Sequence, residues 1–273
     1  MPYFSVLISV YYKEKAEYLD SALKSVLINQ TLKPTELVLV ADGKLTHELY
    51  LVIGKYKKIF SNFNLVQLPQ NVGLGRALNE GLKHCSYDWV ARMDSDDIST
   101  PDRFEKQYEY IKSHPNVSVI GSWVSEFQDY PQNITSIKKV PEIHTDILQY
   151  ARSRNPINHP VVFFNKLAVL SVGGYEHCPL FEDYWLWVRL LQNKIQFYNI
   201  QKSLLLFRAN SLMYERRGGL TYIKDECNFL YKTRKLGFIN TFTFIKNIAI
   251  RSCFRIIPNN IRTILYQRIL RKK

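Results

Sequence analysis

The stretch ARMDSDDISTPDR, residues 91–103, begins at the end of an apolar run that predicts a buried strand. Directly after that run come Asp94, Asp96 and Asp97. Carboxylates at this spacing repel one another and raise one another's pKa unless a cation is bound. Oxygen ligands at this density suit Mg²⁺ or Mn²⁺, which also bind phosphate oxygens. The stretch therefore predicts a divalent metal site at the end of a strand.

The sequence that leads up to this stretch alternates strand and helix patterns with short breaks, which predicts a parallel sheet with crossover helices. The expected strands are residues 5–10, 37–41, 64–68 and 89–93, and the expected helices are residues 16–29, 46–60 and 74–84. Each strand ends in polar residues, which are Ser9 and Tyr11, Asp42 and Gly43, Asn71 and Gly73, and Asp94 and Asp96. Ligands of open α/β sheets bind at this carboxyl edge.

The sequence after the acidic stretch has shorter and less regular patterns. Pro101 is expected to occupy the first position of a helix that is capped by Ser99 or Thr100 and ends at Ser113. The further expected helices are residues 143–152, 166–172, 181–192 and 219–236, and the further expected strands are residues 117–124, 195–199 and 204–208. The simplest partition is one α/β domain over residues 1–240 and a tail over residues 241–273.

The tail carries most of the net charge of +13, because it has eight basic residues and no acidic one. Its basic residues alternate with Ile, Phe and Leu, with one break at Pro258, and no apolar run reaches the roughly 18 residues that a spanning helix needs. This basic amphipathic pattern is typical of a helix on an anionic membrane surface. A helix pair that packs on the domain or is solvated is the alternative. Nucleic acid is not expected, because no recognition motif occurs.

The compartment is expected to be the cytoplasm. No basic region followed by an apolar core opens the sequence, so an export signal is not expected. The four cysteines are far apart and form no metal-ligand spacing, which favours reduced thiols.

A second acidic pair opens the helical pattern LFEDYWLWVRLL, residues 180–191. Glu182 and Asp183 in a first turn are favourable to the helix dipole without any further role. A carboxylate across a cleft from a metal-bound leaving group is also what deprotonation of an incoming hydroxyl requires. The pair is therefore a candidate for general-base catalysis.

Several motifs together resemble glycosyltransferase family 2 in order and spacing, over about residues 3–236. They are SVLISVYYKEKAEYLDSALKSVLINQT, ELVLVADG, NVGLGRALNEGL, ARMDSDDISTPDRFEKQ, NHPVVFF, GGY and FEDYWLWVRLL. Within the family the sequence is most similar to enterobacterial enzymes of O-antigen and exopolysaccharide assembly, including the amylovoran type. The resemblance implies a GT-A fold, a nucleotide-sugar donor, Mn²⁺ or Mg²⁺, and inversion at the anomeric carbon.

The resemblance also implies roles for single residues. The uracil and ribose pocket would be lined by Ser9, Tyr11 and Asp42, with Arg76 near the nucleotide and Asp94 on the ribose side. Asp96 would ligate the metal and Asp183 would be the general base. Where the family usually has Asp-Asp-Gly, this sequence has Ala41-Asp42-Gly43. The first acid is therefore missing, but the second acid, to which the resemblance assigns uracil binding, is present as Asp42.

The acceptor or the diphosphate would be met by a second group of residues, which are His159, Glu182, Arg208, Arg216 and Arg217. A turn histidine and an exposed basic loop are the alternative interpretations of these positions.

The complete hypothesis is an inverting, metal-dependent transferase that moves galactose or glucose from a UDP-sugar to a sugar-diphosphate-polyprenyl acceptor. The product would be β-linked, with β1,3 as the expected bond, in O-antigen or exopolysaccharide repeat assembly. The enzyme would work as a peripheral protein on the cytoplasmic face of the inner membrane. A sugar nucleotidyltransferase and a non-catalytic basic membrane adaptor are the alternatives.

Overall fold

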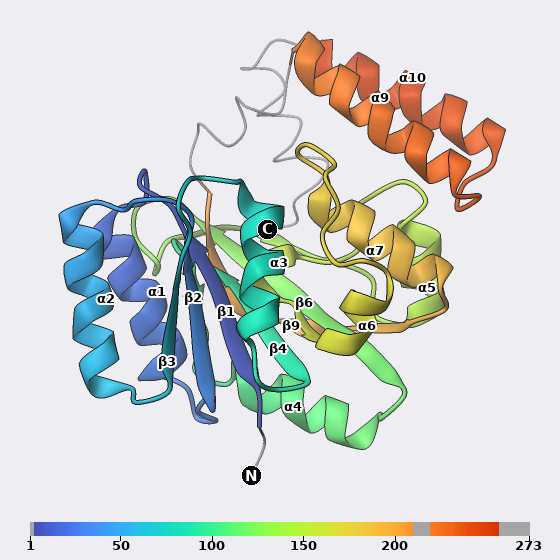
Figure 1. The fold of residues 1–273 in the computed structure, drawn as a ribbon. Helices are drawn as coiled ribbons and strands as arrows, with labels where there is room; N and C mark the ends of the chain where they lie inside the picture. Colours follow the sequence, from blue (N-terminus) through green and yellow to red (C-terminus); the bar gives the residue numbers. More distant parts are fainter. Residues whose placement is uncertain (1–2, 210–218, 257–273) are drawn as a thin grey trace.

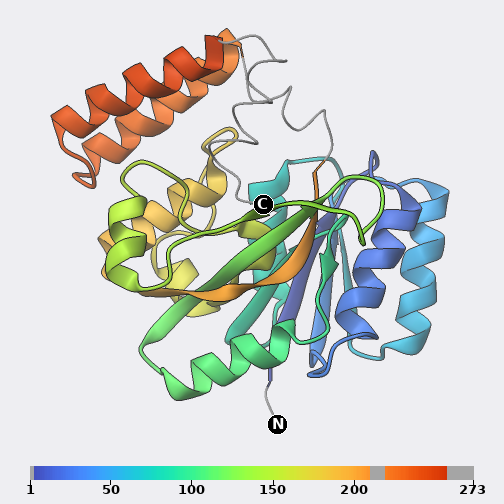
Figure 2. The same cartoon turned by 180° about the vertical axis from the view of Figure 1, so that it is seen from behind.

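One curled nine-stranded sheet forms the centre of the computed structural model, which describes residues 3–209 and 219–256 (Figures 1 and 2). The strands are β1 (Ser5–Val10), β2 (Glu36–Ala41), β3 (Phe63–Gln67), β4 (Trp89–Asp94), β5 (Ile98–Ser99), β6 (Val117–Phe127), β7 (Ile134–Lys138), β8 (Phe163–Asn165) and β9 (Gln196–Arg208). Their order in the sheet is β3-β2-β1-β4-β8-β6-β9-β5, and β7 pairs with β6. Strands β1 to β4 pair in parallel, and β9 runs parallel to β6.

Helices cover both faces of the sheet. They are α1 (Ala16–Leu27), α2 (His47–Ile59), α3 (Leu74–His84), α4 (Arg103–Ser113), α5 (His144–Tyr150), the 3-10 turn η1 (His159–Val161), α6 (Lys166–Ser171), α7 (Glu182–Gln192), α9 (Leu220–Lys235) and α10 (Thr241–Ile256). Apolar side chains of α1, α2 and α4 form one core with the sheet, and those of α3, α5, α6, α7 and α9 form the other. Strand β2 is buried along its whole length, which explains the continuous apolar run from Leu37 to Ala41.

The predicted parallel sheet with crossover helices is confirmed, and two local predictions were wrong. The residues expected to form two strands, 195–199 and 204–208, belong to the single strand β9, whose register against β6 shifts so that pairing continues through the polar break. Helix α4 begins at Arg103, because Thr100 bonds to the Asp102 carboxylate and to the Leu204 carbonyl.

Helices α9 and α10 lie side by side, away from the sheet (Figures 1 and 2). Glu226 of α9 is 2% exposed and accepts hydrogen bonds from Arg251 at 2.7 Å and from Arg255 at 2.9 Å. The Asn247 side chain donates to the Arg152 carbonyl at 2.8 Å. The first half of the basic tail is therefore held against the rest of the protein through its own polar side chains.

The rest of the tail, residues 257–273, lies outside the described residues. Within the part of the chain that the structure does describe, no helix is both long and apolar enough to cross a bilayer. Contact of the tail with a membrane surface stays a prediction.

Replacing Glu226 by Ala is expected to destabilise the α9–α10 pair. The change leaves the Arg251 and Arg255 guanidinium groups without their carboxylate in a largely buried place, which costs about 3 kcal/mol of unfolding free energy. Chemical denaturation and limited proteolysis measure this loss. Glu109→Ala, at an exposed position of α4, is the matched control and should leave the midpoint unchanged. An unchanged midpoint for Glu226→Ala would mean that these ion pairs do not hold α10.

Candidate active site

The carboxyl edge of the parallel strands gathers several of the predicted site residues. Ser9 is the register partner of Asp94 across β1 and β4. Asp42 follows β2 directly, and its backbone N–H donates to the Val10 carbonyl at 2.8 Å. Tyr11 follows β1 and is 37% exposed. The arrangement follows from parallel pairing, which brings the carboxyl ends of strands to one edge.

Asp42 holds the turn that leads into α3. Its Oδ1 accepts from the Val72 N–H at 2.7 Å, and its Oδ2 accepts from the Gly73 N–H at 3.1 Å and from Asn71 Nδ2 at 3.0 Å. Gly43 has a φ of +86°, and a Cβ there would lie 2.8 Å from the Asn71 nitrogen. Since a carboxylate has about four acceptor positions, the Asp42 side chain keeps about one of them for a ligand.

Asp94 is paired with a buried cation, Arg92 of the same strand. Arg92 Nη1 donates to Asp94 Oδ2 at 3.0 Å, and a second hydrogen bond joins Nη2 to Oδ1. The Arg92 side chain is 1% exposed, whereas that of Asp94 is 30% exposed. Two hydrogen bonds from a planar guanidinium fix the orientation of the carboxylate at the edge of the site.

Asp96 lies among other acids. Burial, together with the negative charges of Asp94 and Glu14, raises its pKa to about 7, although Arg208 acts in the opposite direction. Glu14 itself is held by the Ser95 hydroxyl, which donates at 2.6 Å. Negative charge therefore converges on Asp96 from two chain segments.

Arg208 shapes this acidic turn from inside the protein. Its Nε donates to the Asp96 carbonyl at 3.0 Å, and its backbone N–H donates to Asp97 Oδ1 at 2.8 Å. Its guanidinium lies 3.8 Å from the centre of the Tyr18 ring. Asp97 is fully buried, and burial together with Asp96 raises its pKa. Arg216 and Arg217 were also predicted to bind a diphosphate, and both lie outside the described residues.

The residues present fit a divalent cation at Asp96. No three acidic, histidine or cysteine side chains within residues 3–209 and 219–256 are arranged as a metal site. The turn nevertheless presents the Asp96 carboxylate in a field of like charge, which a cation would relieve. A site with one such ligand would need further oxygens from a ligand, as Mg²⁺ does when it binds through one or two carboxylates and substrate phosphates.

The second acid, Asp183, lies in the first turn of α7. Asn155 Nδ2 donates to its Oδ2 at 2.7 Å, and the Tyr184 N–H donates to its Oδ1 at 2.7 Å. Burial raises the pKa of Asp183, and these two hydrogen bonds act in the opposite direction. The result is a carboxylate that is fixed in place and more basic than an exposed aspartate.

A pocket of about 240 Å³ lies between the start of α3 and residues 175–182, and it brings Arg76 and Glu182 together. Gly75 allows this close approach, because a Cβ there would lie 3.3 Å from Glu182 Cγ. Burial raises the pKa of Glu182. The pocket therefore offers a cation and a carboxylate, and that carboxylate directly precedes Asp183 in the first turn of α7.

The acidic turn with Asp94 and the first turn of α7 with Asp183 share a buried neighbour, Tyr175. His159 Nε2 and the Tyr175 hydroxyl are hydrogen-bonded at 2.9 Å. Burial and the positive charge of Arg92 keep the pKa of His159 well below its usual value, so the ring is neutral. Burial raises the pKa of Tyr175, and the charges of Asp183 and Asp94 add to the rise. Asp94 and Asp183 thus both lie close enough to Tyr175 to act on it electrostatically.

Sequence reasoning missed three residues of this site. Arg92 had a visible signal, a charge inside the apolar run WVARM. Asn79 of α3 donates to the Tyr175 carbonyl at 2.7 Å and accepts from the Tyr175 N–H at 2.8 Å, and so fixes that turn. Asn155 touches Asp183 from a loop 28 residues upstream, and no local pattern marks it.

Known proteins match both the sequence and the fold. The model of glycosyl transferase family 2 matches residues 5–171. The amylovoran biosynthesis glycosyltransferase AmsE of Erwinia amylovora is 41% identical over 97% of this chain and 98% of its own length. A UDP-Gal:alpha-D-GlcNAc-diphosphoundecaprenol beta-1,3-galactosyltransferase of Escherichia coli is 38% identical over 99% of this chain and 98% of its own length.

Solved structures share the fold at low sequence identity. The mannosyltransferase PcManGT from Pyrobaculum calidifontis, in complex with GDP-Man and Mn²⁺, has a TM-score of 0.66 at 14% identity and covers 96% of this chain and 72% of its own. TarS of S. aureus, in complex with UDP-GlcNAc, has a TM-score of 0.65 at 17% identity and covers 84% of this chain and 66% of its own.

The fold and the relatives define the class of protein, an enzyme with the GT-A fold that transfers glycosyl groups. The chain belongs to glycosyl transferase family 2. The predicted fold class and the predicted family are confirmed. Nucleotidyl transfer and a purely adaptor role, the two alternatives, are set aside by this membership.

Proposed function

We propose that the enzyme is an inverting, metal-dependent hexosyltransferase that moves galactose or glucose from a UDP-sugar to a polyprenyl-diphosphate-linked sugar. The product would be β-linked, with β1,3 as the expected bond, in the assembly of an O-antigen or exopolysaccharide repeat unit. The observation that carries the proposal is the near full-length similarity to the E. coli galactosyltransferase, whose name gives UDP-Gal as donor and GlcNAc-diphosphoundecaprenol as acceptor.

Asp183 is the general base of the proposed reaction. An acceptor hydroxyl attacks the anomeric carbon of the donor from the face opposite the UDP oxygen, and its proton moves to a carboxylate oxygen of Asp183. The new bond joins that carbon to the acceptor oxygen, and the bond to the UDP oxygen breaks as UDP leaves. An α-linked donor therefore gives a β-linked product. The raised pKa of Asp183 and its hydrogen bond from Asn155 support this role.

Asp96 would hold the divalent cation, Mn²⁺ or Mg²⁺. A bound cation supplies neutralisation of the charge that develops on the UDP diphosphate. The nucleotide would lie along the carboxyl edge of β1, β2 and β4, against Ser9, Tyr11 and Asp42, with Arg92 orienting Asp94 toward the ribose. Arg76 would approach the donor from the pocket that it shares with Glu182.

The acceptor would enter from the side of α7. Glu182 is the best placed of the candidate acceptor residues, because it lines a pocket and directly precedes the base in α7. His159 is neutral and bonded to Tyr175, so it would act by shaping the site and not by charge. A polyprenyl acceptor resides in a membrane, and the basic tail fits a position on the anionic cytoplasmic face of the inner membrane.

The test is a panel of UDP-sugars with Mn²⁺ and an N-acetylhexosamine-diphosphate lipid. We expect UDP to be released from UDP-galactose or UDP-glucose when the lipid is present, with a β-linked product by NMR. Little release is expected without the lipid. Consumption of a donor with retention of the α-configuration, or release that ignores the acceptor, would contradict the proposal.

Replacing Asn155 by Ala is expected to shift the pH dependence of transfer. The change removes a donor to the Asp183 carboxylate that lowers the pKa of this base, so the pKa rises further. Since the protonated base is inactive, the acidic limb of kcat/KM moves to higher pH. At pH values on that limb, kcat/KM falls about tenfold, because a charge-assisted hydrogen bond contributes about 1.5 kcal/mol.

Asn133→Ala, at an exposed loop position, is the control for this pH profile and should match the wild type. A uniform loss of activity at all pH values, with the limb unmoved, would mean that Asn155 does not act through Asp183.

A further inference from the structure

Helix α10 turns polar side chains and the partly buried Phe244 and Ile248 toward the protein, and it exposes further apolar side chains to solvent. Arg251 and Arg255 point to the buried Glu226, and Asn247 is 5% exposed. The outer side carries Phe242, 76% exposed, and Ile245, 60% exposed. A surface helix of a globular protein normally has polar residues on the side that faces solvent, so these exposed apolar side chains are unusual.

The exposed apolar side of α10 extends from Phe242 to Cys253. Its members, which we call the α10 stripe, follow the spacing of one helical face and are Phe242, Ile245, Ala249, Ile250 and Cys253. Ile250 is 57% exposed. Apolar side chains that are exposed together on one helical face are typical of an interaction site.

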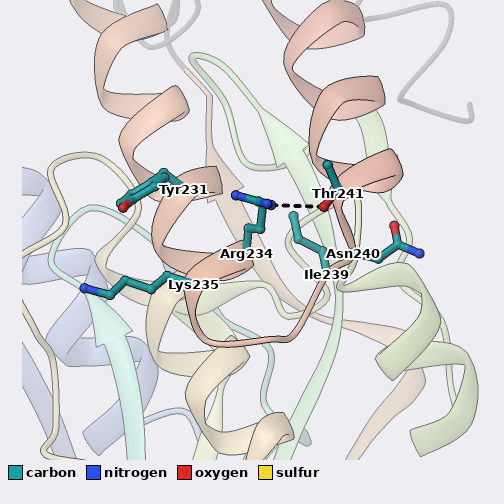
Figure 3. Close-up of a pocket in the computed structure, with 6 residues that line it drawn as sticks. All are labelled: Tyr231, Arg234, Lys235, Ile239, Asn240 and Thr241. Atoms are coloured by element: carbon teal, nitrogen blue, oxygen red, sulfur yellow. Dashed lines mark hydrogen bonds between the residues drawn. The ribbon is translucent and has the colours of Figure 1, made fainter.

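Cations accompany the α10 stripe, and α10 has no acidic residue. Lys246 is exposed among the apolar side chains. At the turn between the two helices, Arg234 and Lys235 line a pocket of about 440 Å³ (Figure 3). In that pocket Arg234 Nε donates to the Thr241 hydroxyl at 3.3 Å. The surface therefore combines apolar side chains, which can insert at the boundary between headgroups and acyl chains, with cations that can bind phosphate groups.

We propose that the α10 stripe is the membrane-docking surface of the enzyme and inserts into the interface of an anionic bilayer, while Arg234, Lys235 and Lys246 bind lipid phosphates. The Arg251 and Arg255 pairs with Glu226 fix the rotation of α10, so that the apolar side faces outward. The inference rests on the proposed membrane-bound acceptor for its choice of partner.

The positive charge of this surface favours a bilayer over two other possible partners, a second copy of the chain and residues 257–273. A second copy in a symmetric dimer would bring Lys246 of one α10 near the same residue of the other, with no acid on either helix to compensate. Residues 257–273 have five basic residues and no acidic one, so they also add like charge. An anionic lipid surface complements all of these cations.

The test measures co-sedimentation of the full chain with vesicles of phosphatidylethanolamine and phosphatidylglycerol. Replacing Phe242, Ile245 and Ile250 together by Ser is expected to weaken partitioning into the vesicles by about 100-fold. The reason is that each substitution removes the favourable free energy of transferring an apolar side chain from water into the bilayer. The matched control replaces by Ser three apolar residues of α2 and α6 that are also more than half exposed, namely Leu51, Ile59 and Leu167. This control should bind like the wild type.

A second measurement does not need the triple variant. Cys253 is an exposed thiol at the end of the α10 stripe, whereas Cys85 and Cys178 are buried. In a Cys227→Ser background, an environment-sensitive fluorophore on Cys253 should shift to shorter wavelength when the anionic vesicles are added. Vesicles of phosphatidylcholine should cause a much smaller shift.

Two results would overturn the inference. One is equal vesicle binding by the triple variant and the wild type, with no shift at Cys253. The other is a dimer, seen by sedimentation velocity, that the triple variant loses while vesicle binding is unchanged. The assays contain no donor or acceptor, so a failure of transfer activity with normal vesicle binding would count against the proposed function alone.

Discussion

Replacing Asp183 by Asn should reduce the rate of glycosyl transfer by about 10²- to 10⁴-fold, which is the usual contribution of a general base. The amide has the shape of the carboxylate, and its oxygen can still accept from the Tyr184 N–H while the Asn155 amide turns over to accept from the new NH2 group, so the first turn of α7 should keep its structure. It cannot accept the acceptor's proton at neutral pH. Donor affinity, measured by calorimetry with UDP-sugar and Mn²⁺, should stay within about twofold of the wild type.

Asp146→Asn, at an exposed position of α5, is the control for this substitution and should transfer at the wild-type rate. Turnover by Asp183→Asn near the wild-type level would show that another group takes the proton. A parallel loss of donor affinity would instead indicate that Asp183 binds the donor.

Replacing Asp96 by Asn should remove most of the metal-dependent affinity for the donor. The substitution takes away the proposed metal ligand while it also relieves the crowding of negative charge by Asp94 and Glu14. We expect UDP-sugar to bind about 100-fold more weakly in the presence of Mn²⁺, because the metal contributes several kcal/mol at the diphosphate. Removal of Mn²⁺ by chelation should then have little further effect on the variant.

Asp88→Asn is the control for this substitution. Asp88 is exposed and precedes β4, whereas Asp96 follows that strand. This control should keep the Mn²⁺ dependence of the wild type. An Asp96→Asn protein whose donor affinity still rises with Mn²⁺ as in the wild type would show that the metal is held elsewhere.

Much of the site could be predicted because its signals are local. Asp94 and Asp96 follow an apolar strand, and Glu182 and Asp183 open an apolar helix. The parallel pairing of β1, β2 and β4 then brings polar strand ends to one edge without any long-range information beyond strand order. The two-strand prediction for residues 195–208 was wrong for the opposite reason, since the pairing of β9 with β6 overrides a polar break in the local pattern.

The side chains that orient the acids could not be predicted in the same way. The contact of Asn155 with Asp183 and the hydrogen bonds of Asn79 with Tyr175 join segments that only the folded chain brings together. The role of Arg92 also depends on the fold, because its charge matters through the acids and the histidine around it and not through its neighbours in sequence.

By itself, the sequence of this glycosyltransferase determined its family, its candidate acidic residues and the basic amphipathic pattern of the tail. The sequence pattern shows which residues share a face of a helix, but it does not show which face packs against the rest of the protein. Only the tertiary structure decided this for α10, because the buried Glu226 draws Arg251 and Arg255 inward and leaves Phe242 and Ile245 outside. The physical reason is that a buried carboxylate needs cationic partners more than these exposed side chains need burial.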